Sequence, residues 1–196
     1  MSEEASVGKP PPYYLVLLHH PVYDKNGCVV TTAVANMDVH DIARAARTYG
    51  VQRYYIVTPL EAQTRLVAKI LAHWQKGYGA VFNPSRQEAF QLVCIKANLE
   101  EVLSEVARLS GKEIRLVVTG AGLADNVVTC KTLKSMMMQE EAAYVIVFGT
   151  GSGLSKEIMD RANYRLSAVK GPTGYNHLSV RSAVSIILDR LWGDRT

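Results

Sequence analysis

The chain has 196 residues, of which 48% are hydrophobic and 20% are charged, so it can bury the core of one globular domain and leaves little room for two. No apolar run approaches the roughly 18 residues of a membrane-spanning helix, which argues against a membrane protein. The net charge of +4 permits a polyanionic partner without requiring one.

The cysteines and the N-terminal segment narrow the class of protein further. Cys28, Cys94 and Cys130 are far apart, and no histidines have metal-ligand spacing, so neither a structural metal site nor a disulfide framework is expected. This usage fits the reducing cytoplasm. Residues 1–12 are acidic and then proline-rich, without a basic and apolar leader, and we interpret them as a flexible tail before a single domain at 13–196.

Expected strands and helices alternate along the chain. Apolar runs predict strands over residues 13–19, 53–58, 92–96, 114–119, 143–148 and 164–169. Amphipathic periodicity predicts helices over residues 38–49, 61–75, 98–109, 132–141, 155–162 and 178–191. This alternation indicates an α/β fold with a mainly parallel sheet flanked by helices. Because ligands bind beyond the carboxyl ends of such strands, the segments after Thr58, Thr119, Phe148 and Val169 are candidate binding loops.

A glycine-rich turn, Gly149-Thr-Gly-Ser-Gly153, lies between an expected buried strand and an expected helix. Glycines there allow backbone amides to approach a ligand closely, although an ordinary strand-to-helix turn can have the same composition. A Rossmann site, and with it a nucleotide-dependent oxidoreductase, is disfavoured. That fingerprint normally follows the first strand and needs a carboxylate about twenty residues later, where this chain has Lys170.

Three segments, in order, resemble the SpoU-type branch of the SPOUT (α/β-knot) methyltransferases. They are Asn36–Val51 (NMDVHDIARAARTYGV), Phe148–Ser155 (FGTGSGLS) and Asn176–Asp189 (NHLSVRSAVSIILD). In detail the chain is similar to a small family of SPOUT RNA methyltransferases, some of which are attached to tRNA guanine-N1 methyltransferases (TrmD). The first motif's second asparagine aligns with Asp38, and the asparagine of the third motif aligns with His177, or with Asn176 in the neighbouring register.

The resemblance implies a deep trefoil knot near the C-terminus and a homodimer formed by the first and last expected helices. It also implies S-adenosylmethionine as cofactor, held by three loops around residues 119–122, 149–153 and 170–178. The candidate cofactor-binding residues are Thr119, Gly120, Gly149, Thr150, Gly151, Gly153, Val169, Gly171, Asn176, His177 and Leu178.

Methyl transfer requires a donor and a nucleophile that are close and aligned, and removal of any proton on the nucleophile. The resemblance places the family's functional arginine at Arg44. Since the guanidinium pKa lies above about 12, we interpret Arg44 as orienting the nucleotide or stabilising developing charge, and Asp38 as the better base for a ring nitrogen. A surface ion pair between Asp41 and Arg44 is the structural alternative. His40 and Arg47 extend a basic stripe with Arg44 and are candidate substrate-binding residues.

The sequence therefore predicts a cytoplasmic, metal-free, homodimeric methyltransferase that uses S-adenosylmethionine and modifies tRNA or rRNA. A ribose 2′-hydroxyl and a base nitrogen are both open as targets. The alternative is a knotted domain that binds the cofactor or RNA without catalysis. His19 and His20, at the end of the first expected strand, could touch substrate, although a structural role is favoured.

Overall fold

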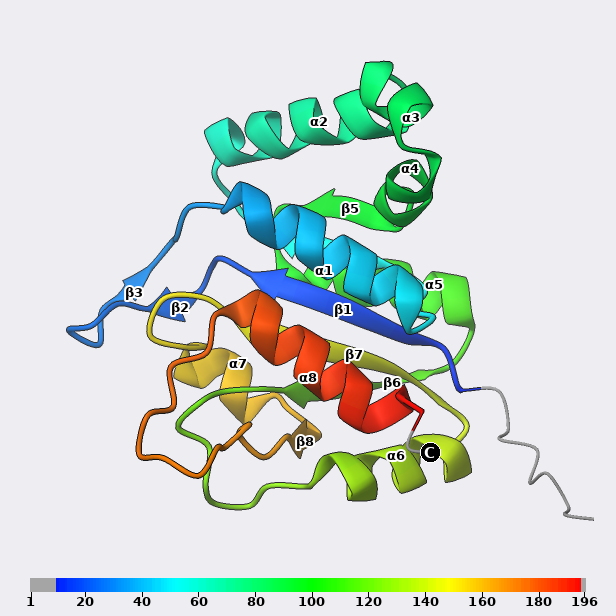
Figure 1. The fold of residues 1–196 in the computed structure, drawn as a ribbon. Coiled ribbons are helices and arrows are strands. Elements are labelled where there is room, and N and C mark those ends of the chain that lie inside the picture. Colours follow the sequence, from blue (N-terminus) through cyan, green and yellow to red (C-terminus); the bar gives the residue numbers. More distant parts are fainter. Residues whose placement is uncertain (1–9, 195–196) are drawn as a thin grey trace, which may run out of the picture.

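The computed structural model describes residues 10–194, so residues 1–9 of the expected flexible tail lie outside the described part. The main strands are β1 (Tyr13–Leu18), β4 (Tyr54–Val57), β5 (Val93–Lys96), β6 (Glu113–Val118), β7 (Ala142–Gly149) and β8 (Tyr164–Arg165). They form one sheet in the order β5-β4-β1-β7-β6-β8, and every neighbouring pair is parallel (Figure 1). The predicted α/β class with a mainly parallel sheet is confirmed.

Helices cover both faces of this sheet. They are α1 (Asn36–Thr48), α2 (Glu61–Gln75), α3 (Tyr78–Phe82), α4 (Pro84–Phe90), α5 (Leu99–Ser110), α6 (Cys130–Gln139), α7 (Lys156–Asp160) and α8 (Val180–Trp192). Helices α1, α6 and α8 contribute to the core on one face, and α5 and α7 contribute to the core on the other. Helices α1 and α8 lie side by side in front of the sheet in Figure 1.

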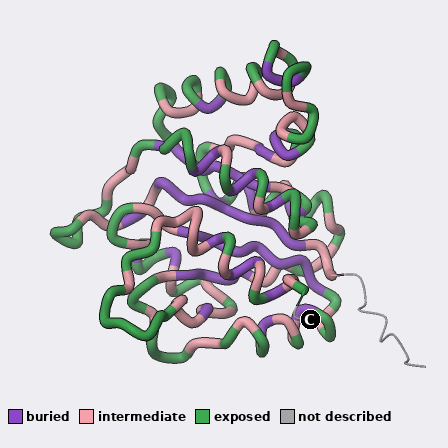
Figure 2. Tube along the Cα trace, in the orientation of Figure 1, coloured by how far each residue is buried: buried purple, intermediate pink, exposed green. Residues whose placement is uncertain are grey.

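Strand β1 divides its side chains between the two cores. Odd-numbered residues from Tyr13 to Leu17 pack with α1 and α8, and even-numbered residues from Tyr14 to Leu18 pack with α5 and α7. Because both faces are covered, the strand is apolar throughout, as expected for the middle of a parallel sheet. Figure 2 shows β1 and β7 buried along most of their length, with exposed residues gathered in loops and on outer helix faces.

Two parts of the predicted layout are wrong. The strand expected over residues 164–169 ends at Arg165, because β8 is an edge strand and residues beyond it make only isolated contacts, a bond from Leu166 to Val118 and a bridge to Val128. The chain then leaves the sheet as a loop. Helices α3 and α4, of five and seven residues, were not predicted because they are too short to show a full amphipathic pattern.

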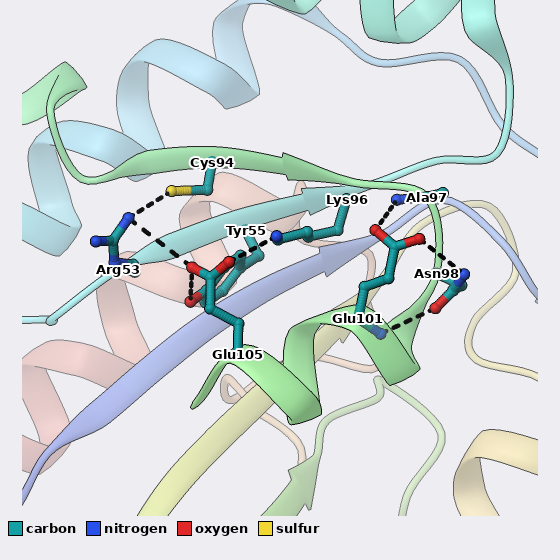
Figure 3. Close-up of polar contacts among 8 residues, drawn as sticks. All are labelled: Arg53, Tyr55, Cys94, Lys96, Ala97, Asn98, Glu101 and Glu105. Atoms are coloured by element: carbon teal, nitrogen blue, oxygen red, sulfur yellow. Dashed lines mark hydrogen bonds and ion pairs between the residues drawn. The ribbon is translucent and has the colours of Figure 1, made fainter. Parts of the chain in front are cut away.

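Helix α5 begins at a side-chain cap. The side-chain Oδ1 of Asn98 accepts a hydrogen bond from the Glu101 amide at 2.9 Å, and the Glu101 carboxylate accepts from the Ala97 amide at 3.3 Å (Figure 3). The first of these bonds satisfies one of the amides that a helix start leaves without partners, and the second ties the preceding residue to the helix.

One turn further along α5, Glu105 connects the helix to strands β4 and β5. Its carboxylate accepts from the Tyr55 hydroxyl at 3.0 Å and lies 2.6 Å from Lys96 Nζ and 3.9 Å from Arg53 (Figure 3). Arg53 also donates to Cys94 Sγ at 3.1 Å. The hydrogen bond from Lys96, with that from Tyr55, lowers the pKa of Glu105 despite its partial burial.

Replacing Glu105 by glutamine should lower the free energy of unfolding near neutral pH by about 1–3 kcal/mol, because the bonds to a charged acceptor are lost. A carboxyl pKa that is lower in the folded state stabilises the protein above the unfolded pKa, and this contribution disappears as pH falls through the folded pKa. Urea unfolding from about pH 7 to about pH 3 should therefore show the two proteins converging in acid. Glu157→Gln, at an exposed position on α7, is the control. A pH-independent difference for Glu105→Gln would contradict this account.

Candidate functional site

A cavity of about 850 Å³ opens at the carboxyl ends of β6 and β7. Three loops form most of its wall, and they follow β6, β7 and β8 in the chain. The wall residues fall mainly in segments 119–123, 148–154, 167–169 and 176–180. This volume is in the range of pockets that bind nucleoside-sized ligands, and its position is where parallel sheets bind them.

The first loop starts at a fixed point. Thr119 is buried, and both its amide and its hydroxyl donate to the carbonyl oxygen of Val147, at 3.1 and 3.0 Å. This double contact holds the end of β6 against β7. The loop that begins with Gly120 therefore leaves the sheet in one direction, along the cavity.

The glycine loop after β7 is held by a small hairpin that the sequence did not predict. Strands β2 (Val22–Tyr23) and β3 (Val29–Val30) pair antiparallel beside the main sheet. The Tyr23 carbonyl accepts from the Ser152 amide at 2.8 Å, and the Tyr23 amide donates to the Gly153 carbonyl at 2.8 Å. The loop is consequently bonded to the hairpin on both sides of its turn.

Two of the loop's glycines have backbone angles that other residues rarely adopt. Gly151 has φ +60°, and a Cβ there would stand 2.7 Å from the Tyr23 carbonyl oxygen. Gly153 has φ +113° with open space where its Cβ would be. Glycine is therefore needed at both positions, at Gly151 for space as well as for conformation.

The third loop closes against the first. Asn176 Nδ2 donates to the Ala121 carbonyl oxygen at 2.8 Å, which connects segments 55 residues apart in sequence. Helix α8 then begins at Ser179, whose hydroxyl accepts from the Ser182 amide. The three loops meet around one space, whereas the candidate segment after Thr58 is not part of the cavity wall.

The structure brings together almost all of the predicted cofactor-binding residues. Gly171 belongs to the third loop but is not part of the cavity wall. The predicted residues on the wall are Thr119, Gly120, Gly149, Thr150, Gly151, Gly153, Val169, Asn176, His177 and Leu178. Their contact with a cofactor stays a prediction.

Asp38 lies on the cavity wall near the start of α1 and is 7% exposed. Arg181, in the first turn of α8, donates from Nη1 to Asp38 Oδ1 at 3.1 Å. The same guanidinium lies 3.6 Å from Asp41, so Asp41 pairs with Arg181, and residues 10–194 contain no Asp41–Arg44 ion pair. Arg181 was missed by the sequence reading. Its position in the first turn of α8 could have indicated an ion pair, because a cation there is disfavoured by the helix dipole unless an anion lies nearby.

The predicted basic stripe on α1 is only partly exposed. His40 is half-buried and packs edge-on against Trp74 and Phe90, with ring centroids 5.4 and 4.8 Å apart, and burial lowers its pKa. It therefore does not extend an exposed cationic surface, and its role in substrate binding stays a prediction. Arg47 is exposed and paired with Glu88.

Arg44 is exposed on α1 and is not part of the cavity wall. Its guanidinium has no ion-pair partner within the described part of the chain. A cation in this position is available to an external group and does not face the cavity of its own chain.

Residues 10–194 contain no group of three or more histidine, cysteine or acidic side chains placed to hold a metal ion. In the same range, no helix combines the length and the apolar character required to cross a bilayer.

Comparisons with known proteins show the family to which this chain belongs. The family model for SAM-dependent RNA methyltransferases matches residues 12–193. An uncharacterized protein from Aquifex aeolicus is 39% identical over 179 residues, which are 91% of this chain and 87% of that protein. A tRNA (guanine-N(1)-)-methyltransferase from Nitratidesulfovibrio vulgaris is 39% identical over 181 residues, which are 92% of this chain but 42% of that protein. The chain therefore spans less than half the length of that relative.

The fold is also similar to that of a solved SpoU-type enzyme. The SpoU methyltransferase AviRb from Streptomyces viridochromogenes, determined in complex with AdoMet, matches with a TM-score of 0.56 and 15% identity. The match covers 93% of this chain and 57% of that one, and it confirms the SPOUT fold class expected from the three motifs. Because the family model covers nearly the whole chain, this protein belongs to the family of S-adenosylmethionine-dependent RNA methyltransferases.

Proposed function

We propose that this protein methylates a tRNA, with the cofactor in the cavity between the three loops and the acceptor nucleotide entering beside Asp38. The observation that carries the proposal is the glycine-lined cavity of about 850 Å³ with a buried carboxylate on its wall. The tRNA substrate is inferred from the name of the longer relative, of which this chain matches only part.

The residues present fit S-adenosylmethionine. The cavity wall combines apolar side chains, including Leu123, Phe148 and Leu178, with the backbone of two glycine-containing loops. An adenine ring needs an apolar slot and main-chain hydrogen bonds, and this wall supplies both kinds of surface. When bound, the cofactor supplies a methyl group on a positively charged sulfur, which is open to attack by a nucleophile.

We assign Asp38 as the base that removes the proton from the acceptor nucleotide. Its carboxylate is fixed by Arg181, so it is held at the wall in one position and does not swing into solvent. A carboxylate in this place can accept a proton from a ring nitrogen as the methyl group is transferred. Arg44, outside the wall, is assigned to orienting the nucleotide or stabilising developing charge.

We further propose that two copies pair through α1 and α8, and that Arg44 serves the site of the partner subunit. A shallow surface depression between these helices is lined by Asp41, Arg181 and Ile186 among others, and Met37 nearby is 58% exposed. An isologous contact across this surface would bring two copies of α1 together. The proposal includes a deep trefoil knot near the C-terminus, supported by the fold likeness, and a cytoplasmic location, supported by the cysteine usage.

Binding and transfer can be measured separately. Calorimetry should show binding of S-adenosylmethionine and S-adenosylhomocysteine but not of NAD, and NAD binding alone would reject the assignment of the cavity. Tritiated methyl transfer should then label bulk tRNA in preference to rRNA, and digestion of the product would distinguish a base nitrogen from a ribose hydroxyl. Cofactor binding without transfer to any RNA would favour a non-catalytic binding domain.

A further inference from the structure

His19, the residue after β1, is completely buried and is connected to the glycine loop through Thr32. Its Nδ1 lies 2.9 Å from the hydroxyl of Thr32, and that hydroxyl lies 2.5 Å from the hydroxyl of Thr150. Thr150 in turn donates to the Leu18 carbonyl oxygen at 3.2 Å. Both threonines line the cavity, while His19 lies behind them and outside the wall.

The hydrogen-bond partners determine which group donates in each bond between His19, Thr32, Thr150 and Leu18. The single hydroxyl proton of Thr150 is given to Leu18, so Thr150 must accept the proton of Thr32. The Thr32 hydroxyl then has no proton left for His19, so it accepts a hydrogen bond from the ring. This requires a proton on Nδ1 of His19. One tautomer of the ring therefore satisfies the whole sequence of bonds.

The second ring nitrogen of His19, Nε2, differs from Nδ1 in its contacts. Nε2 of His19 is buried and has no hydrogen-bond partner among the described residues. Burial lowers the pKa of His19 to about 4, so the ring is neutral near neutral pH and carries its one proton on Nδ1. A buried polar atom without a partner disfavours folding, so an apolar residue would suit this position better if only core packing mattered.

We propose that His19 is a positioning residue for the cofactor site: its Nδ1–H orients Thr32, and through it Thr150, so that the glycine loop keeps its binding conformation. This inference rests on the proposed function, in that the ligand of the cavity is taken to be S-adenosylmethionine. The end of the first strand thereby supplies the donor that orients the glycine loop.

Asparagine and glutamine distinguish this role from a merely structural one. The amide of His19→Asn can place an N–H donor near the position of Nδ1, whereas the longer His19→Gln reaches toward the position of Nε2. With S-adenosylhomocysteine as the calorimetric probe, His19→Asn should keep the dissociation constant within about threefold of wild type, and His19→Gln and His19→Leu should raise it about tenfold or more. Equal affinity of His19→Leu and wild type, or equal weakness of the asparagine and glutamine variants, would overturn the proposal.

Two further variants test whether the effect passes through Thr32 and is separate from stability. Thr32→Val should weaken binding as His19→Gln does, and the double variant should be little weaker than either single one. Val57→Ala is the matched control, because Val57 is buried beside Leu18 in the sheet but is not on the cavity wall. It should lower the melting temperature and leave the dissociation constant unchanged. If it weakens binding as much as His19→Gln at the same loss of melting temperature, the inference is wrong.

Hydrogen exchange gives a readout that does not depend on the ligand. The Ser152 amide, bonded to Tyr23, should exchange faster in His19→Gln than in His19→Asn, since only the latter retains the donor. Equal exchange in the two variants would refute the positioning role. A wild-type protein that binds no S-adenosylhomocysteine would instead reject the proposed function, and the exchange result would still decide on His19.

Discussion

Gly151→Ala should weaken cofactor binding by roughly 100-fold. The new Cβ would stand 2.7 Å from the Tyr23 carbonyl oxygen, which belongs to the backbone of β2 and cannot rotate away. The residue would also have to keep φ near +60°, where alanine is disfavoured by about 1–2 kcal/mol. The loop must therefore shift, and with it the cavity wall. Calorimetry with S-adenosylhomocysteine measures the change.

Gly111→Ala is the control for backbone strain. Gly111 ends α5 with φ +63°, but its Cβ would meet nothing within 4 Å and it is not on the cavity wall. This variant should lose about 1–2 kcal/mol of stability in urea unfolding and bind cofactor as wild type does. If Gly151→Ala also binds normally, the glycine loop does not form the cofactor site.

Arg44→Ala should reduce methyl transfer by about 10²–10³-fold while cofactor affinity stays nearly unchanged. The side chain is exposed and outside the cavity wall, so its loss removes an interaction with the nucleotide or with developing charge and leaves the cofactor pocket intact. Single-turnover transfer to tRNA and calorimetry separate the two effects. Arg108→Ala removes another exposed arginine from α5, on the other face of the sheet, and should transfer at the wild-type rate.

Mixed dimers would show which subunit Arg44 serves. If a site combines the glycine loop of one subunit with Arg44 of the other, a dimer of one Arg44→Ala and one Gly151→Ala subunit retains one intact site and about half the wild-type activity. If both groups serve the same subunit, neither site of that dimer is intact. Transfer by Arg44→Ala at the wild-type rate would remove the residue from the mechanism, and parallel loss of cofactor binding would show a structural role.

The architecture of the molecule was largely readable from local pattern. Runs such as residues 13–18 and 142–149 are apolar on both faces because helices cover both sides of the sheet, and periodicity records that directly. The expected helix over residues 61–75 has the bounds of α2. The glycine loop was also recognisable from local sequence, since positive φ angles and close backbone contacts require glycine whatever the surrounding fold.

Contacts between distant segments were decided only by the tertiary structure. Asp38 and Arg181 are 143 residues apart, and nothing in either neighbourhood indicates that α1 and α8 pack side by side. His40 looked like part of a basic stripe, but the packing of α2 and α4 encloses it between aromatic rings. The bonds from His19 to Thr150 likewise depend on β1 and β7 being neighbours in the sheet. Local sequence specifies which side chains a segment buries, whereas the partners they meet depend on how all the segments pack together.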